Sequence, residues 1–206
     1  MGMLLKRTLV AVMLVLGAGV PVGTQTPVPA PPSASAAMVI EALCVAQDFQ
    51  HRIDDYVWLH RLLEGPLPPL RVTTNMDDIR SAQRMLAARI RAARVNARRG
   101  DLITADVAHL FRMRIAGALP AEAWAAVLAE AMEDEQGRPI RRVPLRVNME
   151  WPDDVPFTFV PPQLLAALPA LPAELQYRII GRSLVLWDHH ANLIVDVFPD
   201  AFVGLT

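Results

Sequence analysis

The sequence predicts an α+β fold, in which an N-terminal bundle of about four helices is followed by a small antiparallel β-rich C-terminal part. Three observations lead to this prediction. Apolar residues recur at helical spacing in four segments between residues 38 and 131. After Pro139, short runs rich in β-branched and aromatic residues replace that pattern. Turn-forming residues separate these runs, and the chain carries no internal repeat.

The first predicted helix spans residues 38–64 and has an apolar face. With about 100° between successive residues, eight side chains share one side of this helix: Ala42, Val45, Ala46, Phe49, Ile53, Tyr56, His60 and Leu63. Gly65 and Pro66 end it, because the residue before a proline disfavours the helical conformation. Trp58 and Leu62 lie opposite the apolar face. Since a helix with large apolar groups on both sides is usually covered on both, we expect Trp58 to pack under the C-terminal part.

The second predicted helix spans residues 76–99. Polar residues suited to an N-cap precede it: Thr73, Thr74 and Asn75. Asp77 and Asp78 suit the positive end of the helix dipole, and Gly100 is the expected stop. The side expected to be buried carries Ile79, Leu86 and Ile90.

Two shorter helices complete the helical half. Thr104 caps a third helix that runs from Ala105 to about Ala118. Its apolar residues recur at helical spacing: Val107, Leu110, Phe111 and Ile115. Pro120 fits the first position of a fourth helix, and Gly137 begins the segment that ends it. One face of the fourth helix carries Trp124, Val127, Leu128 and Ala131.

The C-terminal part is predicted to be mostly strand. Residues 143–149 alternate apolar residues with polar ones or Pro144, which indicates a strand at a sheet edge. A short helix is expected over residues 161–168. Three further strands follow at 177–180, 183–188 and 193–198, joined by turns at 181–182 and 189–192. We expect Tyr177 and Trp187 to pack the sheet.

The start of the chain is typical of a secretion signal. Lys6 and Arg7 precede an apolar run of about 13 residues, and a Pro-rich stretch then ends in Ala-Ser-Ala at Ala36. The run is too short to cross a hydrocarbon core of about 30 Å comfortably. We therefore expect export to the periplasm or the medium, with cleavage near Ala36. The alternative is an uncleaved N-terminal anchor on a Pro-rich stalk.

This reading divides the chain into a leader and two parts. Residues 1–36 form the signal peptide and Pro-rich leader, 37–137 a helical domain, and 138–206 a small β-rich part packed on the helices. Without the leader, about 170 residues remain, which is enough to bury a core. No later run is apolar enough to span a membrane after signal cleavage.

Composition limits the possible partners. Of 20 basic side chains, removal of Lys6 and Arg7 leaves 18 against 21 acidic ones, a net charge of about −3. This balance argues against general nucleic-acid affinity, which needs a basic surface. Cys44 is the single cysteine, so the chain cannot form an internal disulfide. Within a helical pattern, Cys44 is expected to be a small buried residue, with intermolecular pairing as the alternative.

Several segments resemble a family of uncharacterised exported bacterial proteins. The segment YRIIGRSLVLWDHHANLIVDVFPDAF, preceded by LLAALPALPAEL, is similar to the C-terminal ends of that family. YVWLHRLLEGPLPPL and IRAARVNARRGDLITADVAHLFR are similar to its helical half. The resemblance implies export and this layout. It implies no activity, because the family has none assigned.

Four groups of residues are candidates for chemistry. His60 lies within the apolar face near Tyr56, which predicts a hydrogen-bonded buried residue, with a ligand or proton-transfer role as the alternative. Asp188 and His190 share one face of an extended chain at a hairpin tip and are candidate metal ligands, although two ligands are too few for structural zinc. The alternative for this tip is a polar turn.

An arginine stripe on the second predicted helix is the third group. Its members lie in a narrow sector, with Arg94 at its edge: Arg80, Arg84, Arg91 and Arg98. Arginine suits phosphate or carboxylate recognition, so the stripe is a candidate site for an anionic ligand. The alternative is a solvated face, partly paired with Glu130 and with Glu133–Glu135.

The fourth group is a pair of Asp-x-x-His motifs, Asp48/His51 and Asp106/His109. This spacing places acid and histidine on one helical face, as in helical di-metal proteins. Asp48 and His51 point away from the apolar face, however, and solvated surface pairs explain both motifs better. No motif for a nucleophilic serine, a zinc protease, a redox dithiol or a nucleotide loop is present.

These observations favour an exported, non-enzymatic protein that binds a partner and needs no cofactor. The partner would be an envelope protein or an anionic envelope component. One alternative is a hydrolase whose site is assembled from scattered residues such as His60, His109 and Asp188. The other is a binder of an anionic ligand through the arginine stripe.

Overall fold

The computed structural model describes residues 34–68, 73–133, 144–151 and 160–205, and it confirms the α+β class. Five helices come first: α1 (Ala34–Glu64), α2 (Met76–Ala93), α3 (Ala105–Ala118), α4 (Ala121–Glu130) and α5 (Pro162–Ala167). A three-stranded antiparallel sheet follows, in the order β1 (Leu175–Ile180), β2 (Ser183–Asp188), β3 (Leu193–Phe198). The predicted boundary between helical and β-rich parts, near residue 137, lies outside the described residues.

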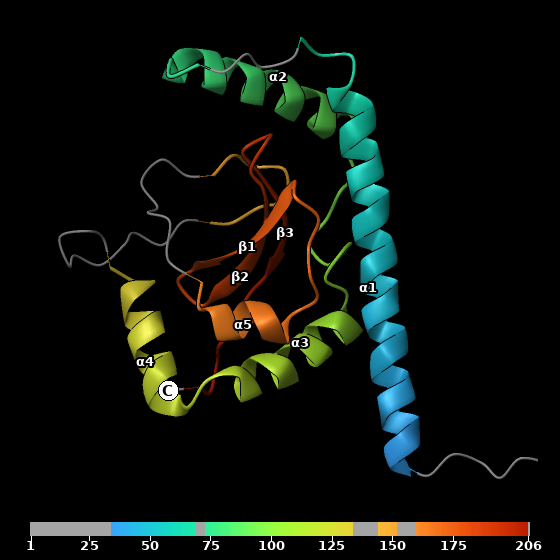
Figure 1. The fold of residues 1–206 in the computed structure, drawn as a ribbon, viewed down its shortest axis with the longest axis vertical. Helices are drawn as coiled ribbons and strands as arrows, with labels where there is room; N and C mark the ends of the chain where they lie inside the picture. The colour runs from blue at the N-terminus through green and yellow to red at the C-terminus, as the bar shows by residue number, and fades with distance from the viewer. Residues whose placement is uncertain (1–33, 69–72, 134–143, 152–159, 206) are drawn as a thin grey trace, which may run out of the picture.

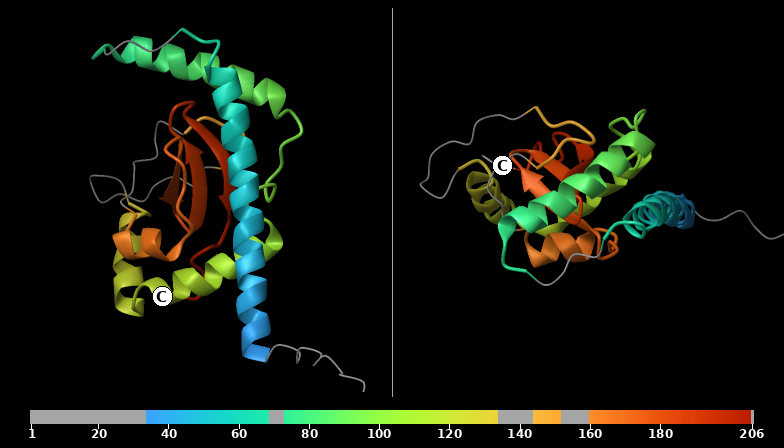
Figure 2. Two further views of the ribbon diagram at one scale, coloured as in Figure 1. Left: turned by 45° about the vertical axis from the view of Figure 1, so that its right-hand side comes forward. Right: turned by 90° about the horizontal axis from the view of Figure 1, so that it is seen from above.

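The helices are arranged around the sheet. Helix α1 runs along one side of it, α2 crosses one end, and α3 and α5 lie at the other end (Figure 1). The turned views place α2 across the top of the sheet and α1 at its flank (Figure 2). Helix α1 contacts both α2 and α3, and α3 contacts α5. Helix α1 is therefore held by helices that lie at both ends of the sheet (Figure 1).

One apolar core joins the helices to the sheet. Phe49 on α1 meets Phe111 on α3 edge to face, with ring centroids 5.1 Å apart. Ile179 and Leu186 of the sheet belong to the same buried cluster. Each large side chain so buried contributes about 1.5–3 kcal/mol relative to an exposed one. The helical face predicted from the spacing of Phe49, Ile53 and Tyr56 is confirmed as buried.

The opposite face of the sheet has a smaller core of its own. Trp187 and Trp151 pack there with ring centroids 5.5 Å apart, together with neighbours from all three strands. Every residue of β3 is buried, because both faces of this strand are covered. Trp187 and Tyr177 are both buried, as predicted.

The segment before Trp151 is not the edge strand that the alternation predicted. Only Glu150 forms an isolated bridge, to Leu193, and Val143 lies outside the described residues. Asn148 adopts a positive φ of 64° and its side chain donates to the carbonyl of Arg94. A left-handed residue limits extended pairing. Three backbone hydrogen bonds still join residues 148–151 to β3 and the residue before it: Asn148 and Trp151 donate to the carbonyls of Ile194 and Asn192, and Met149 accepts from Ile194.

Helix α2 ends earlier than Gly100. A buried carboxylate, Asp196 on β3, accepts hydrogen bonds from the backbone N–H groups of Gly100, Leu102 and Ile103, each at 2.9 Å. Gly100 has a φ of 90°, which favours glycine. These contacts hold the chain in a loop between α2 and α3.

The N-caps of α2 and α3 are residues that were predicted as caps from the sequence. The Asn75 side chain accepts from the N–H of Asp77 at the start of α2, and Thr104 accepts from Val107 at the start of α3. Pro120, expected as the first residue of the fourth helix, is instead its N-cap, and α4 begins one position later at Ala121. The sheet begins at Leu175, two residues earlier than expected, while β2 and β3 have the predicted limits.

Two predictions of burial are wrong. Trp58 is 67 % exposed, and Cys44 is also exposed. Among the described residues, the buried side chains of α1 lie on the Phe49/Tyr56/His60 side, which carries the apolar stripe. Within the described ranges, no helix combines the length and the apolar character needed to cross a membrane.

Candidate functional site

The end of α1 meets the β2–β3 hairpin, and histidines and carboxylates gather at this junction. His60 and Glu64 are four residues apart, so they lie one helical turn apart on the same face of α1. Asp188 ends β2, and His190 follows in the hairpin turn. The β2–β3 pairing shifts register between Leu186 and Trp187, and such bulges re-aim nearby side chains.

His60 is bound to Asp188 inside the protein. Its Nδ1 lies 2.6 Å from Oδ2 of Asp188, and both side chains are wholly buried. Two further groups donate to the same carboxylate: the Tyr56 hydroxyl to Oδ2 at 2.6 Å and the Ala191 N–H to Oδ1 at 2.9 Å. The prediction that His60 is a hydrogen-bonded buried residue is therefore confirmed.

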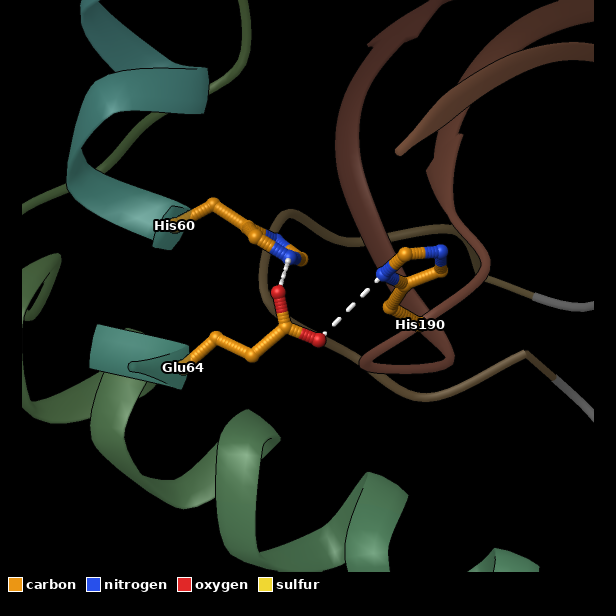
Figure 3. A group of neighbouring side chains, drawn as sticks. All are labelled: His60, Glu64 and His190. Carbon is orange, nitrogen blue, oxygen red and sulfur yellow. Dashed lines mark hydrogen bonds and ion pairs between the residues drawn. The ribbon is translucent and has the colours of Figure 1, made fainter. Parts of the chain in front are cut away.

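This arrangement fixes the imidazole of His60. Because a carboxylate only accepts hydrogen bonds, Nδ1 carries the proton and Nε2 points the other way. Nε2 lies 3.2 Å from Oε2 of Glu64 (Figure 3). Burial alone lowers the pKa of His60, but the hydrogen bond and charge of Asp188, helped by Glu64, outweigh it, so the pKa is raised.

His190 reaches the same carboxylate from the hairpin. Its Nδ1 lies 3.4 Å from Oε1 of Glu64, so Glu64 bridges the two imidazoles (Figure 3). The rings of His60 and His190 are 5.5 Å apart. His189 bonds elsewhere, with Nε2 2.7 Å from the carbonyl oxygen of Ala173.

Three of these side chains can act as metal ligands together. One atom from each of His60, Glu64 and His190 falls within a group whose members all lie within 4.8 Å of one another. The structure thus gives different roles to Asp188 and His190, the pair considered from the sequence. His190 belongs to the group, whereas Asp188 stands behind His60. Glu64 was missed, although its spacing from His60 was a usable signal.

A pocket of about 610 Å³ opens beside this group. Glu64, His189, His190 and Gln83 give it polar atoms. Its other lining residues are apolar or glycine: Gly65, Leu67, Pro68, Ile79, Ala82, Met85 and Leu86. Such a combination of apolar walls and a few polar groups is common in small-molecule sites.

The structure divides the predicted arginine stripe. Arg80 and Arg84 line a smaller groove of about 290 Å³ that also contains Glu150. Arg91 donates to the Asn148 carbonyl and pairs with Glu150 at 2.6 Å. Glu150 is not one of the expected partners, which were Glu130 and Glu133–Glu135. Residues 134 and 135 lie outside the described residues.

The remaining arginines lie beyond the end of α2. Arg94 bonds to the Asn148 side chain and stacks 5.0 Å from the centre of the Tyr56 ring. Arg98 is exposed in the loop that follows. The early end of the helix therefore removes the continuous stripe.

Both Asp-x-x-His motifs lie on the surface, as predicted. Asp48 pairs with Arg52 at 2.8 Å, one turn away on α1, and His51 is exposed. Asp106 and His109 are exposed on α3.

Comparison with protein-family models, with curated proteins and with solved structures found no match. The junction of α1 with the hairpin is therefore judged on its own geometry.

Proposed function

We propose that this is an exported, non-enzymatic protein that binds a small amphiphilic molecule in the pocket between the end of α1, α2 and the β2–β3 hairpin. The observation that carries the proposal is the pocket itself. Its volume of about 610 Å³ falls within the range typical of small-molecule sites.

The lining defines the chemistry of the bound molecule. Ile79, Met85 and Leu86 offer apolar contact to its body. Glu64 and His190 offer hydrogen bonds to a polar head group. An apolar body with one polar end therefore fits this pocket better than a fully charged molecule.

Binding is favoured over hydrolysis by the partners of His60. Both of its ring nitrogens face carboxylates, Asp188 at 2.6 Å and Glu64 at 3.2 Å. A general base would instead direct its free nitrogen at a nucleophile or a water. The arginine groove is also the weaker candidate, because Glu150 in its wall opposes an anion.

Export is supported by the leader: its basic start, its apolar run and its Ala-Ser-Ala end. Cell fractionation with intact-mass analysis tests this part of the proposal. The expected product is a chain that begins near residue 37, recovered outside the cytoplasm. Full-length protein with Met1 attached, found among cytosolic contents, would contradict export.

The pocket is tested with the neutral apolar dye Nile red in the presence of EDTA. Ala82 lines the pocket and is half-buried, whereas Ala88 is exposed on the same helix. We expect dye fluorescence to rise with the wild-type protein and with Ala88→Trp, and to be lost with Ala82→Trp, which fills the pocket. Equal binding by Ala82→Trp, or no binding by the wild type, would contradict the proposal.

A further inference from the structure

We propose that His60, Glu64 and His190 form a binding site for a divalent transition-metal ion, of which zinc is the best match. Two imidazole nitrogens and one carboxylate oxygen, with one position left open, form the ligand set of several zinc enzymes. The inference concerns the metal alone and does not depend on any molecule in the neighbouring pocket.

The ligand atoms lie close enough to gather around a small tetrahedral ion after modest side-chain movement. With bonds of 2.0–2.1 Å to zinc, neighbouring ligand atoms lie about 3.3 Å apart. Oε2 of Glu64 lies 3.2 Å from Nε2 of His60, and its other oxygen, Oε1, lies 3.4 Å from Nδ1 of His190 (Figure 3). No two of the chosen atoms are more than 4.8 Å apart. The side chains of Glu64 and His190 are 44 % and 39 % exposed, so they have room to close on an ion.

The second shell is already assembled around His60. Metal-binding histidines usually donate their other ring N–H to a carboxylate, which fixes the ring and makes the ligand nitrogen more basic. Asp188 has this position at 2.6 Å from Nδ1. Tyr56 and the Ala191 N–H in turn hold Asp188. Nε2 is thereby directed at Glu64 without any change in the core.

Donor and acceptor roles leave room for a metal ion in place of a proton between His60 and Glu64. Neutral His60 with its proton on Nδ1 has a lone pair on Nε2, which faces an oxygen of Glu64 that also accepts. Either a proton or a metal ion must separate these two groups. Nδ1 of His190, 3.4 Å from the other oxygen of Glu64, either donates its proton to that oxygen or offers its lone pair to an ion.

The kinds of ligand atom indicate which metal the site would hold. Mixed nitrogen and oxygen ligands suit zinc, whereas magnesium and calcium prefer oxygen alone. The site thus selects a transition metal.

Isothermal titration of the tag-free, EDTA-stripped protein with zinc chloride tests the inference. One zinc ion per chain is expected for the wild type. A change in the outer shell of a metal site typically lowers metal affinity by about 10–100-fold. His190→Ala and Glu64→Gln each remove a ligand and should lower zinc affinity by more than that. Asp188→Asn, which alters only the second shell, should fall within that range.

Two histidine variants serve as matched controls. His109→Ala changes an exposed histidine on α3, and His51→Ala changes an exposed histidine earlier on α1. Both should bind zinc as the wild type does. Circular dichroism confirms that each variant is folded. The inference is overturned if the wild type binds no zinc at micromolar concentration, or if Glu64→Gln and His190→Ala retain wild-type affinity.

Discussion

His60 and Asp188 are 128 residues apart in the chain and make a 2.6 Å contact between two fully buried side chains. The contact joins the last turns of α1 to the end of β2. It therefore ties the helical half to the sheet. It also sets the direction of Nε2 of His60, which points toward Glu64. The stability of this junction and the metal binding that we propose there both depend on this pair.

Removing the Asp188 carboxylate is expected to destabilise the protein strongly. Asp188→Ala leaves His60 and Tyr56 without their buried acceptor, and breaking a buried charged pair costs about 3–5 kcal/mol. Urea unfolding measures the change. Asp54→Ala is the control, because Asp54 is exposed and contacts only Gln50 in the described part of the chain; it should change stability by about 0.5 kcal/mol or less. Equal effects of the two variants would contradict the role of Asp188.

Asp196 is expected to control the loop between α2 and α3. Its two oxygens accept from Gly100, Leu102, Ile103 and its own neighbour Val197. Asp196→Ala leaves these N–H groups without their acceptor, and each buried unsatisfied group costs about 1–3 kcal/mol. Hydrogen exchange at the amides of Leu102 and Ile103 should accelerate markedly. Wild-type protection of both amides in the variant would show that the carboxylate does not hold the loop.

Acid should weaken the contact between Glu174 and Arg61. Burial raises the pKa of Glu174, but the 2.6 Å hydrogen bond from Arg61 outweighs it, and the net pKa is lowered from 4.5. A lowered folded-state pKa stabilises the protein above the unfolded value of 4.5, and this stabilisation is lost as pH falls through the lower folded value.

The Arg61→Ala variant isolates that effect. In the variant, Glu174 loses the hydrogen bond and the charge of Arg61, which contribute most to offsetting its burial, so the variant is less stable than the wild type at neutral pH. The difference between the two proteins should shrink as the pH falls below 4.5. Urea unfolding at several pH values measures it. A difference that stays constant with pH would exclude a contribution from this ion pair.

Two tryptophans should respond differently to truncation. Trp124 is 1 % exposed and packs against Phe202, with ring centroids 5.3 Å apart. Trp124→Ala should cost about 3–5 kcal/mol. Trp58 is 67 % exposed, so Trp58→Ala should change stability by about 0.5 kcal/mol or less. Thermal unfolding of both variants measures the change in stability. A large loss of stability in Trp58→Ala would contradict the exposed position of Trp58.

The sequence predicted those features that depend on local pattern. Helical spacing placed Phe49, Ile53 and His60 on the buried face of α1, and strand-turn-strand patterning gave the limits of β2 and β3. Cap chemistry located the starts of α2 and α3. Each of these follows from neighbours within a few residues.

Features that depend on distant partners were not predictable in this way. Helix α2 ends early because Asp196, more than 90 residues later, binds the loop that follows it. Glu64 was overlooked because its importance depends on His190, which only the folded hairpin brings near. Trp58 was misplaced because a helical pattern does not tell which of two apolar faces the rest of the chain covers.

X-ray absorption spectroscopy of the zinc-loaded protein tests the proposed site most directly. Ligation by His60, Glu64 and His190 predicts imidazole nitrogen and carboxylate or water oxygen at 2.0–2.1 Å, with four ligands in all. Cys44 lies 16 residues before His60 on the same helix, about 24 Å away, so no sulfur should appear at 2.3 Å. A sulfur shell, or oxygen ligands without imidazole, would contradict the site.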